Sequence, residues 1–242
     1  MKNKLALSFF LFVFSFGLYA QFGTIGYDFK DPYIDFQGLK FAIRLSTDNN
    51  IYCPNPGQMN IKKLSENEVV LHSNSLSSAG GQLISEGSIE LKLSLTADNR
   101  ISISAKGSHP TEISKTILVL IKGIKVQSMV SEQPQAKGVK DFKDKKGIRV
   151  SYPSRAATMP LVFFTTSDKE WHVISKDRKI RKKGFACFYD HLTNEPVILL
   201  SHDADMRKTS TNIKAPQWVL GNDRPRIEVV KERCVDLEEY FG

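Results

Sequence analysis

Five histidines are the side chains of this sequence best suited to moving protons near neutral pH: His72, His109, His172, His191 and His202. General acid–base catalysis could pair one such histidine, as acid, with a glutamate, as base, if the fold brings the two together. Each of the five lies in or beside a predicted strand, and no recognisable motif joins any of them to a glutamate. A structural role is therefore favoured for all five.

Carboxylates offer a second kind of chemistry, because glycoside hydrolysis usually places two of them about 5 to 9.5 Å apart around the scissile bond. The sequence has 26 Asp and Glu residues, but their spacing does not show which of them meet in the fold. The most metal-like string is His202-Asp203-Ala204-Asp205, whose ligand atoms could hold Ca²⁺ or another divalent ion. A polar turn after a strand explains the same residues more simply. We therefore assign no catalytic residue, no metal site and no cofactor.

Positive charge gathers between Lys176 and Lys183, where the sequence reads Lys-Asp-Arg-Lys-Ile-Arg-Lys-Lys. Clustered cations attract polyanions. No nucleic-acid motif accompanies the run, so a sulfated or uronic-acid glycan is a better candidate ligand than nucleic acid. A hairpin turn with solvated lysines and arginines is the favoured alternative.

The two tryptophans, Trp171 and Trp218, are the candidate carbohydrate-binding residues. Aromatic rings stack on the C–H faces of sugars, so an exposed Trp in a groove of a sandwich would suit contact with a glycan. Trp171 alternates with Val173 in a predicted strand, and Trp218 lies in the segment that leads into the last predicted helix. Packing in the core or against a neighbouring domain is the alternative for both, and the pattern favours it.

The N-terminus predicts export. Lys2 and Lys4 precede an apolar run from Leu5 to Phe16, and Ala20 supplies a small residue at the cleavage edge, so residues 1–20 form a predicted secretory signal peptide. The run of 12 residues is shorter than the ~20 that a membrane-spanning helix needs. We expect a secreted or periplasmic, soluble protein with no membrane partner.

Composition and cysteine content narrow the class of protein further. The 242 residues are 41% hydrophobic and 25% charged, with a formal net charge of +8, which excludes wholesale disorder and fibrous repeats. Cys53, Cys187 and Cys234 allow at most one intrachain disulfide and no C-x-x-C chemistry. Buried small hydrophobic residues are the favoured interpretation of these cysteines.

Alternating apolar and polar residues predict an all-β fold. The clearest element is a hairpin from Ser88 to Lys106, with a turn at Thr96-Ala97-Asp98-Asn99. Short strands at this spacing predict one large antiparallel β-sandwich over residues 21–221, with Gln133 to Lys146 as an exposed loop. The other predicted strands are Leu39 to Leu45, Glu68 to His72, Thr116 to Ile121, Ile148 to Tyr152, Leu161 to Thr166, Trp171 to Ser175, Phe185 to Tyr189 and Val197 to Ser201.

Residues 222–242 predict a C-terminal amphipathic helix that acts as a linker. Asn222-Asp223-Arg224-Pro225 supplies a cap and a proline near the helix start. The apolar residues that follow recur at three and four positions, with charged residues between them: Ile227, Val230, Cys234 and Leu237. Val229, Arg233 and Tyr240 fit around the same amphipathic cylinder. The alternative to a linker is a helix that packs back on the sandwich as its natural end.

The last third of the chain resembles a known junction. It is similar to the passage from an N-terminal β-sandwich into a (β/α)₈ barrel in secreted bacterial glycoside hydrolases. The similar segments are Ala215-Pro216-Gln217-Trp218-Val219-Leu220-Gly221 and the end of the predicted helix, Leu237-Glu238-Glu239-Tyr240-Phe241-Gly242. The stretch Trp171 to Tyr189 resembles the late strands of such sandwiches, which are often galactose-mutarotase-like supersandwiches. The resemblance implies that this chain lacks the barrel that carries the catalytic carboxylates.

Three functions remain open from the sequence. The favoured one is a non-catalytic N-terminal sandwich that supports a following catalytic domain in polysaccharide degradation, with an exposed apolar patch near Trp218 and the helix. The second is an autonomous carbohydrate-binding module, which predicts aromatic residues along a groove. The third is a mutarotase-like epimerase, which predicts a histidine and a glutamate that converge in a groove.

Overall fold

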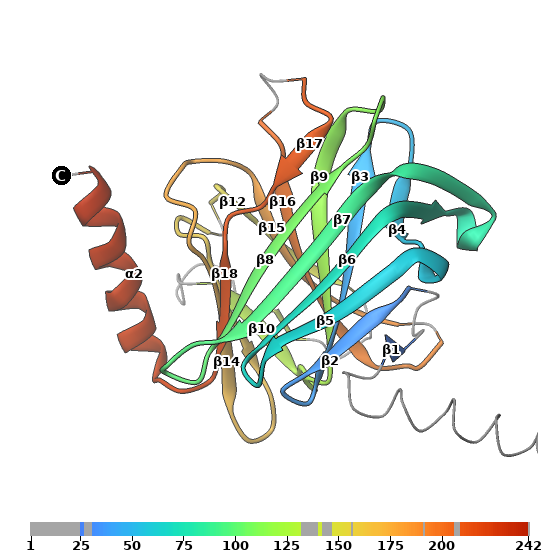
Figure 1. The fold of residues 1–242 in the computed structure, drawn as a ribbon. Helices are drawn as coiled ribbons and strands as arrows, with labels where there is room; N and C mark the ends of the chain where they lie inside the picture. Colours follow the sequence, from blue (N-terminus) through green and yellow to red (C-terminus); the bar gives the residue numbers. More distant parts are fainter. Residues whose placement is uncertain are drawn as a thin grey trace, which may run out of the picture.

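The computed structural model describes residues 25–26, 31–131, 140–141, 147–155, 157–190, 192–205 and 209–241. Two antiparallel sheets pack face to face, and one long helix lies at the C-terminal end (Figure 1). The predicted β-sandwich with a C-terminal helix is confirmed. The predicted signal peptide lies outside the described residues, as does the predicted loop Gln133 to Lys146 apart from a two-residue strand.

The first sheet has the strand order β1-β2-β3-β9-β16-β15-β12. Its middle is built from β9 and β16, where Val119 lies opposite Leu200 and Ile121 lies opposite Ile198. The strands of this sheet are Ile25–Gly26 (β1), Tyr33–Phe36 (β2), Leu39–Thr47 (β3), Ser114–Lys122 (β9), Ile148–Tyr152 (β12), Lys183–Tyr189 (β15) and Pro196–Asp203 (β16).

The second sheet has the order β11-β10-β13-β14-β18-β8-β7-β6-β5, and β17 lies next to β8 at its other end. Strand β4 (Ile51–Pro54) pairs with β3 of the first sheet and with β6 of the second, so it joins the two sheets along one side. The strands are Met59–Ser65 (β5), Glu68–Ser78 (β6), Leu83–Leu95 (β7), Ile101–Ser108 (β8), Ser128–Ser131 (β10), Lys140–Asp141 (β11), Leu161–Thr165 (β13), Glu170–Ser175 (β14), Asn212–Lys214 (β17) and Trp218–Gly221 (β18), with short 3₁₀ turns at Pro56–Gln58 (η3) and Ala79–Gly81 (η4).

The predicted hairpin between Ser88 and Lys106 is confirmed as β7 and β8. Leu91 lies opposite Ala105 and Leu93 lies opposite Ile103, and all four side chains are buried between the sheets. The alternation of the sequence follows from this arrangement, because one face of the hairpin packs on the core and the other meets solvent.

Strand β5 is an edge strand, since it pairs only with β6 among the described strands. Lys62 and Lys63 are exposed, and a register shift follows between Lys63 and Ser65. Both the charges and the irregularity are typical of strands at the open side of a sheet.

Helix α2 (Arg226–Phe241) covers the outer face of β13 and β14. Val229 packs there against Leu161, Phe163 and Ile174. Since the main core covers the inner face of the same strands, β13 is buried on both faces. This explains why its sequence, Leu-Val-Phe-Phe-Thr, is continuously apolar and does not alternate.

The predicted apolar face of α2 is wrong in part. Within residues 226–239 of the helix, Val229 and Arg233 are fully buried, whereas Ile227 is 61% exposed. The buried face of the helix combines the apolar contact of Val229 with a hydrogen bond from Arg233. Arg233 donates from Nη2 to the backbone carbonyl of Asp177 at 2.9 Å, which turns the Ile227 side of the helix away from the sheet. No helix in the described part of the chain is long and apolar enough to cross a membrane.

Candidate functional site

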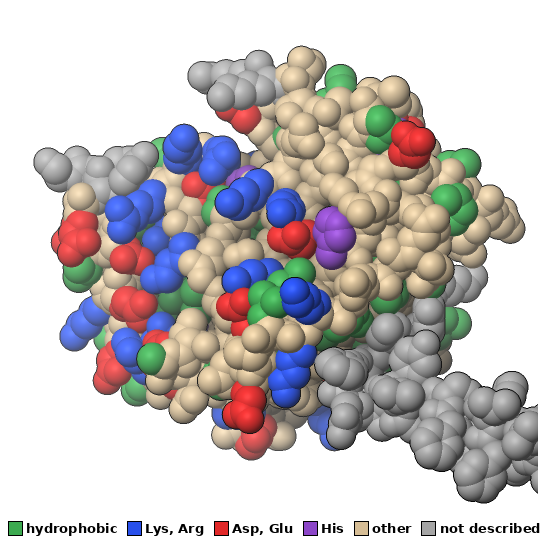
Figure 2. Space-filling model, in the orientation of Figure 1, with side chains coloured by type: hydrophobic (Ala, Val, Ile, Leu, Met, Phe, Trp, Pro, Cys, Tyr) green, Lys and Arg blue, Asp and Glu red, His purple; other side chains and the backbone are tan. Residues whose placement is uncertain are grey.

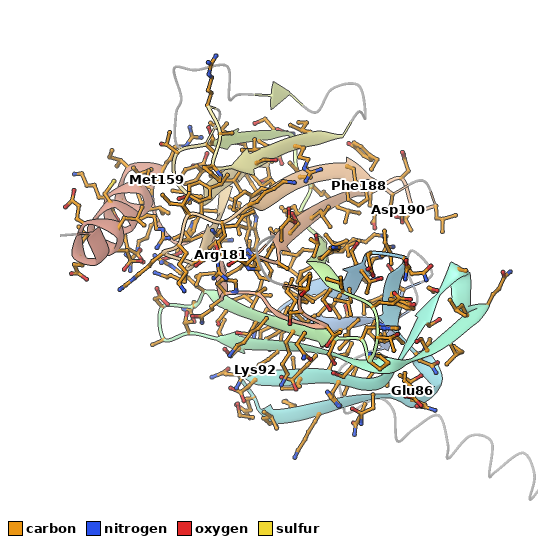
Figure 3. All side chains as sticks on the ribbon, turned by 90° about the horizontal axis from the view of Figure 1, so that it is seen from above. Glu86, Lys92, Met159, Arg181, Phe188 and Asp190 are labelled. Carbon is orange, nitrogen blue, oxygen red and sulfur yellow. The ribbon has the colours of Figure 1, made fainter. Side chains whose placement is uncertain are left out.

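A pocket of about 400 Å³ lies where the connection between β14 and β15 meets the connection between β17 and β18. We call it the basic pocket. Figure 2 shows Lys and Arg side chains gathered, among acidic ones, on the side of the molecule that carries α2. In Figure 3, Arg181 lies toward this same side, away from Glu86. The residues that line the pocket are Lys176, Asp177, Arg178, Lys179, Arg181, Lys214, Ala215 and Pro216.

Asp177 organises the base of the basic pocket. Its carboxylate accepts hydrogen bonds from Arg181 Nε at 3.0 Å and Nη2 at 3.1 Å, and from the backbone N–H of Lys179 at 3.1 Å. Burial raises the pKa of Asp177, but the bonds from Arg181 and Lys179 and the charge of Lys183 outweigh it and lower the pKa. The side chain is therefore an ionised carboxylate that is already saturated with donors.

Lys183 lies under the same loop and is fully buried. Its Nζ donates to the backbone carbonyls of Lys179 at 2.9 Å and Arg181 at 2.8 Å, and lies 3.1 Å from Oδ2 of Asp177. The ammonium also lies 4.8 Å from the centre of the Tyr152 ring. Burial lowers the pKa of Lys183, although the carboxylate of Asp177 opposes this shift. Lys183 thereby fixes the shape of the loop that lines the basic pocket.

Helix α2 forms one side of this ionic cluster. Lys176 Nζ donates to Asp236 Oδ2 at 3.0 Å, and Arg233 is buried with its guanidinium directed to the loop and to Asp236. Arg100 pairs with Asp223, which precedes the helix, and with Glu232, one turn before Asp236, each at 3.0 Å. The helix is thus attached to the sandwich mainly through charge-assisted hydrogen bonds, around a small apolar contact.

The sequence pattern identified only part of the basic pocket. The predicted basic run supplies Lys176, Arg178, Lys179 and Arg181, which all come from one connection. Lys214 comes from β17, a strand that the sequence analysis did not predict, and no local signal links it to the run.

His202 and the acidic residues after it do not form a metal site. His202 is buried, and Asp203 accepts from Thr116 Oγ1 at 3.0 Å and pairs with Lys182 at 3.1 Å. Neighbouring residues of a strand point to opposite faces, so these side chains diverge. In the described ranges no group of three or more His, Cys, Asp and Glu side chains is placed to hold a metal ion.

Ser85, His109 and Glu112 come together in an arrangement that resembles a hydrolytic triad. Ser85 Oγ lies 2.9 Å from His109 Nε2, and Glu112 Oε1 lies 3.9 Å from the same nitrogen. Nδ1 of His109 accepts the backbone N–H of Glu112 at 2.8 Å, so the ring proton must be on Nε2. His109 therefore donates to Ser85 and cannot take its proton, as the base of a triad must. The cluster is structural.

The two candidate carbohydrate-binding residues occupy different environments. Trp218 lies in β18, an interior strand between β14 and β8, and is fully buried in the main core, so its ring offers no face to a sugar. Trp171 is partly exposed, and Lys169 Nζ lies 4.8 Å from the centre of its ring. Contact of Trp171 with a glycan stays a prediction. The structure does not bring the two tryptophans into one pocket among those that the described residues line.

The three cysteines are free thiols in the structure. Cys187 is fully buried, and burial raises its pKa to about 12. Cys53 is partly buried, and burial, followed by the charge of Asp31, raises its pKa to about 11. Such thiols are protonated at neutral pH and are poor nucleophiles.

No family model matches the sequence, and no curated protein sequence matches it. Among solved structures, the chain is similar to the α-N-acetylgalactosaminidase NagBb from Bifidobacterium bifidum, solved with GalNAc, with a TM-score of 0.57 and 9% identity over 89% of this chain and 37% of that protein. A second match is a galactose mutarotase related enzyme from Lactobacillus acidophilus, with a TM-score of 0.37 and 6% identity over 76% of this chain and 82% of the other. The chain spans little more than a third of the glycosidase. The likeness to that protein is one of fold: a β-sandwich that also occurs in a carbohydrate-acting enzyme.

Proposed function

We propose that this chain is an exported, non-catalytic β-sandwich domain that acts in glycan degradation together with a catalytic domain. The observation that carries the proposal is the fold likeness to a glycosidase, which extends over 89% of this chain but only 37% of the glycosidase. A sandwich that corresponds to a minor part of a larger enzyme is expected to support the part that performs the chemistry.

Helix α2 supports the same proposal. Its first residue, Arg226, pairs with Glu170 of β14. In the middle of the helix, Glu232 pairs with Arg100 and Asp236 pairs with Lys176. A helix fixed in this way can transmit a defined orientation to a neighbouring domain. Among the helix side chains whose burial the structure describes, residues 226–239, the large exposed apolar ones are Ile227 and Val235, which lie among charged residues; Trp218 is buried. The contact with a catalytic domain would therefore be mixed in polarity, as interfaces between domains often are.

The two alternatives predict features that the pockets described here lack. An epimerase needs a histidine and a glutamate in one groove, but no histidine lines any of the three pockets of about 230 to 400 Å³. A binding module that uses aromatic stacking needs exposed rings. The tyrosines at these pockets are Tyr52, which is buried, and Tyr189, which is partly buried.

The test has two parts. The first is to read the gene beyond the codon for Gly242, together with its neighbours, where we expect the βα pattern of a catalytic barrel. The second is to assay purified residues 21–242 for hydrolysis of nitrophenyl glycosides, including the α-N-acetylgalactosaminide, and for mutarotation of galactose by polarimetry. We expect neither activity. Turnover above the no-protein control would overturn the non-catalytic role, and the absence of any such gene would overturn the supporting role.

A further inference from the structure

The basic pocket has more positive charge than its own acidic residue can balance. Five cationic side chains and one carboxylate line it. That carboxylate, Asp177, is buried and already accepts from Arg181 and the backbone of Lys179, with the ammonium of Lys183 3.1 Å away. It has no capacity left for the cations at the mouth of the pocket.

The cationic side chains at the mouth of the pocket differ in whether a carboxylate lies close enough to pair with them. Lys176 pairs with Asp236 of α2 at 3.0 Å. Lys179 and Lys214 are exposed, and within the part of the chain that the structure describes neither ammonium has a carboxylate within 4 Å. Lys179 lies in the connection between β14 and β15, whereas Lys214 ends β17, so the two lysines approach the pocket from two sides.

Buried charge under the pocket adds to the same field. Lys183 and Arg233 are fully buried, and a low-dielectric surrounding screens charges less than water would. The carboxylates beside them are shared with other cations, because Asp177 also pairs with Arg181 and Asp236 also pairs with Lys176. A concave surface with fixed cations beneath it and free ammonium groups at its rim attracts anions and concentrates them. The rest of the wall is Ala215 and Pro216, which offers a small apolar surface.

We propose that the basic pocket binds an anionic group of a glycan, either the sulfate of a sulfated sugar or the carboxylate of a uronic acid. Lys179 and Lys214 contact the oxyanion, and Arg181, which Asp177 holds in place, contributes charge. No aromatic side chain lines the pocket, so it lacks the stacking surface with which proteins bind single-stranded nucleic acid. The anion site stands on the geometry alone, whereas the glycan as its carrier rests on the proposed function.

The test compares two variants with equal loss of charge. The double variant Lys179→Gln/Lys214→Gln removes the uncompensated cations of the pocket, and Lys62→Gln/Lys63→Gln removes two exposed lysines from the edge strand β5. Residues 21–242 of each form are titrated calorimetrically, at about 50 and 200 mM NaCl, with chondroitin sulfate, polygalacturonate, neutral dextran and duplex DNA. Sodium sulfate serves as a competitor.

We expect binding to one or both anionic glycans, weaker at the higher salt concentration, and none to dextran. Affinity should fall about tenfold in the pocket variant and less than about twofold in the β5 variant. Binding of chondroitin sulfate but not of polygalacturonate would identify sulfate as the recognised group. Binding of polygalacturonate but not of chondroitin sulfate would identify the carboxylate. Three results would overturn the inference. They are an equal loss of glycan affinity in the two variants, binding of DNA as tight as that of either glycan, and no binding of either glycan. A failure to bind either glycan would not affect the proposed supporting role of the domain. Glycosidase or mutarotase activity of residues 21–242 would overturn that supporting role but would not affect the proposed anion site.

Discussion

Acid should destabilise this protein through His202. The side chain is 1% exposed, and its Nδ1 has no hydrogen-bond partner among the described residues. Burial, followed by the positive charge of Arg181, lowers the pKa of His202 to about 4. Lys183 opposes protonation as well, while the carboxylates of Asp177 and Asp203 favour it without reversing the shift.

The direction and size of the effect follow from the two pKa values. A histidine in the unfolded chain has a pKa of about 6.5, so between pH 6.5 and 4 the unfolded state binds a proton that the folded state does not. The free energy of unfolding therefore falls as the pH drops through this range and levels off below about pH 4. A difference of about 2.5 pH units, at about 1.4 kcal/mol each, corresponds to roughly 3 kcal/mol.

The assay is urea denaturation at pH 7, 6, 5 and 4.5, for the wild type and for His202→Gln. Glutamine does not titrate, so the loss of unfolding free energy between pH 7 and 4.5 should be smaller in the variant by roughly 2 to 3 kcal/mol, whatever its stability at pH 7. His72→Gln is the control, because that side chain is 39% exposed. The role of His202 would be refuted if the wild type and His202→Gln lost the same unfolding free energy between pH 7 and 4.5. It would also be refuted if His72→Gln reduced this loss as much as His202→Gln.

Three further predictions concern single positions. Gly87 has a φ of 138°, and a Cβ there would lie 2.6 Å from a backbone carbonyl oxygen of the facing strand. Gly87→Ala should therefore lower the free energy of unfolding, measured by thermal unfolding, by about 2 kcal/mol or more. The control Gly38→Ala, whose Cβ would contact no other atom within 4 Å, should lower it by about 1 kcal/mol. Asp177→Asn leaves the ammonium of Lys183 buried without a carboxylate, so it should lower the free energy of unfolding in urea by about 3 kcal/mol. A decrease below about 1 kcal/mol would contradict stabilisation of this loop by the Asp177–Lys183 ion pair. Cys187 should react with a thiol reagent only in denaturant, since it is fully buried and its pKa is raised to about 12, and rapid labelling of the native protein would contradict its placement in the core.

The strands were predictable because their pattern depends on local burial. The hairpin that contains Leu91 and Leu93 has one buried and one solvated face, and the sequence alternates accordingly. The strand from Leu161 to Thr165 lies within the predicted strand Leu161 to Thr166, but the sequence does not say that a helix covers its second face. That information belongs to the tertiary contact with Val229.

The basic pocket could be predicted only in part, since pairing and burial of charged groups are long-range properties. The run from Lys176 to Lys183 showed where positive charge gathers, but not that Lys183 is buried beneath the loop while Lys179 stays at its surface. Arg233 was visible in the sequence as one of many charged residues of an amphipathic helix. Its role follows only from the carbonyl of Asp177, which is far from it in the sequence.

The edge strand β5 has features that oppose pairing with a second molecule of this protein. Its outer backbone N–H and C=O groups could pair with a strand of a second copy, but Lys62 and Lys63 follow one another and so project from opposite faces of the strand. A strand that docked along β5 would bring ammonium groups of both molecules close together on either face, and the shift at Ser65 would interrupt its hydrogen-bond ladder. The open side of the sheet thus opposes fibril-like association, and concentrated solutions should remain free of strand-to-strand assemblies.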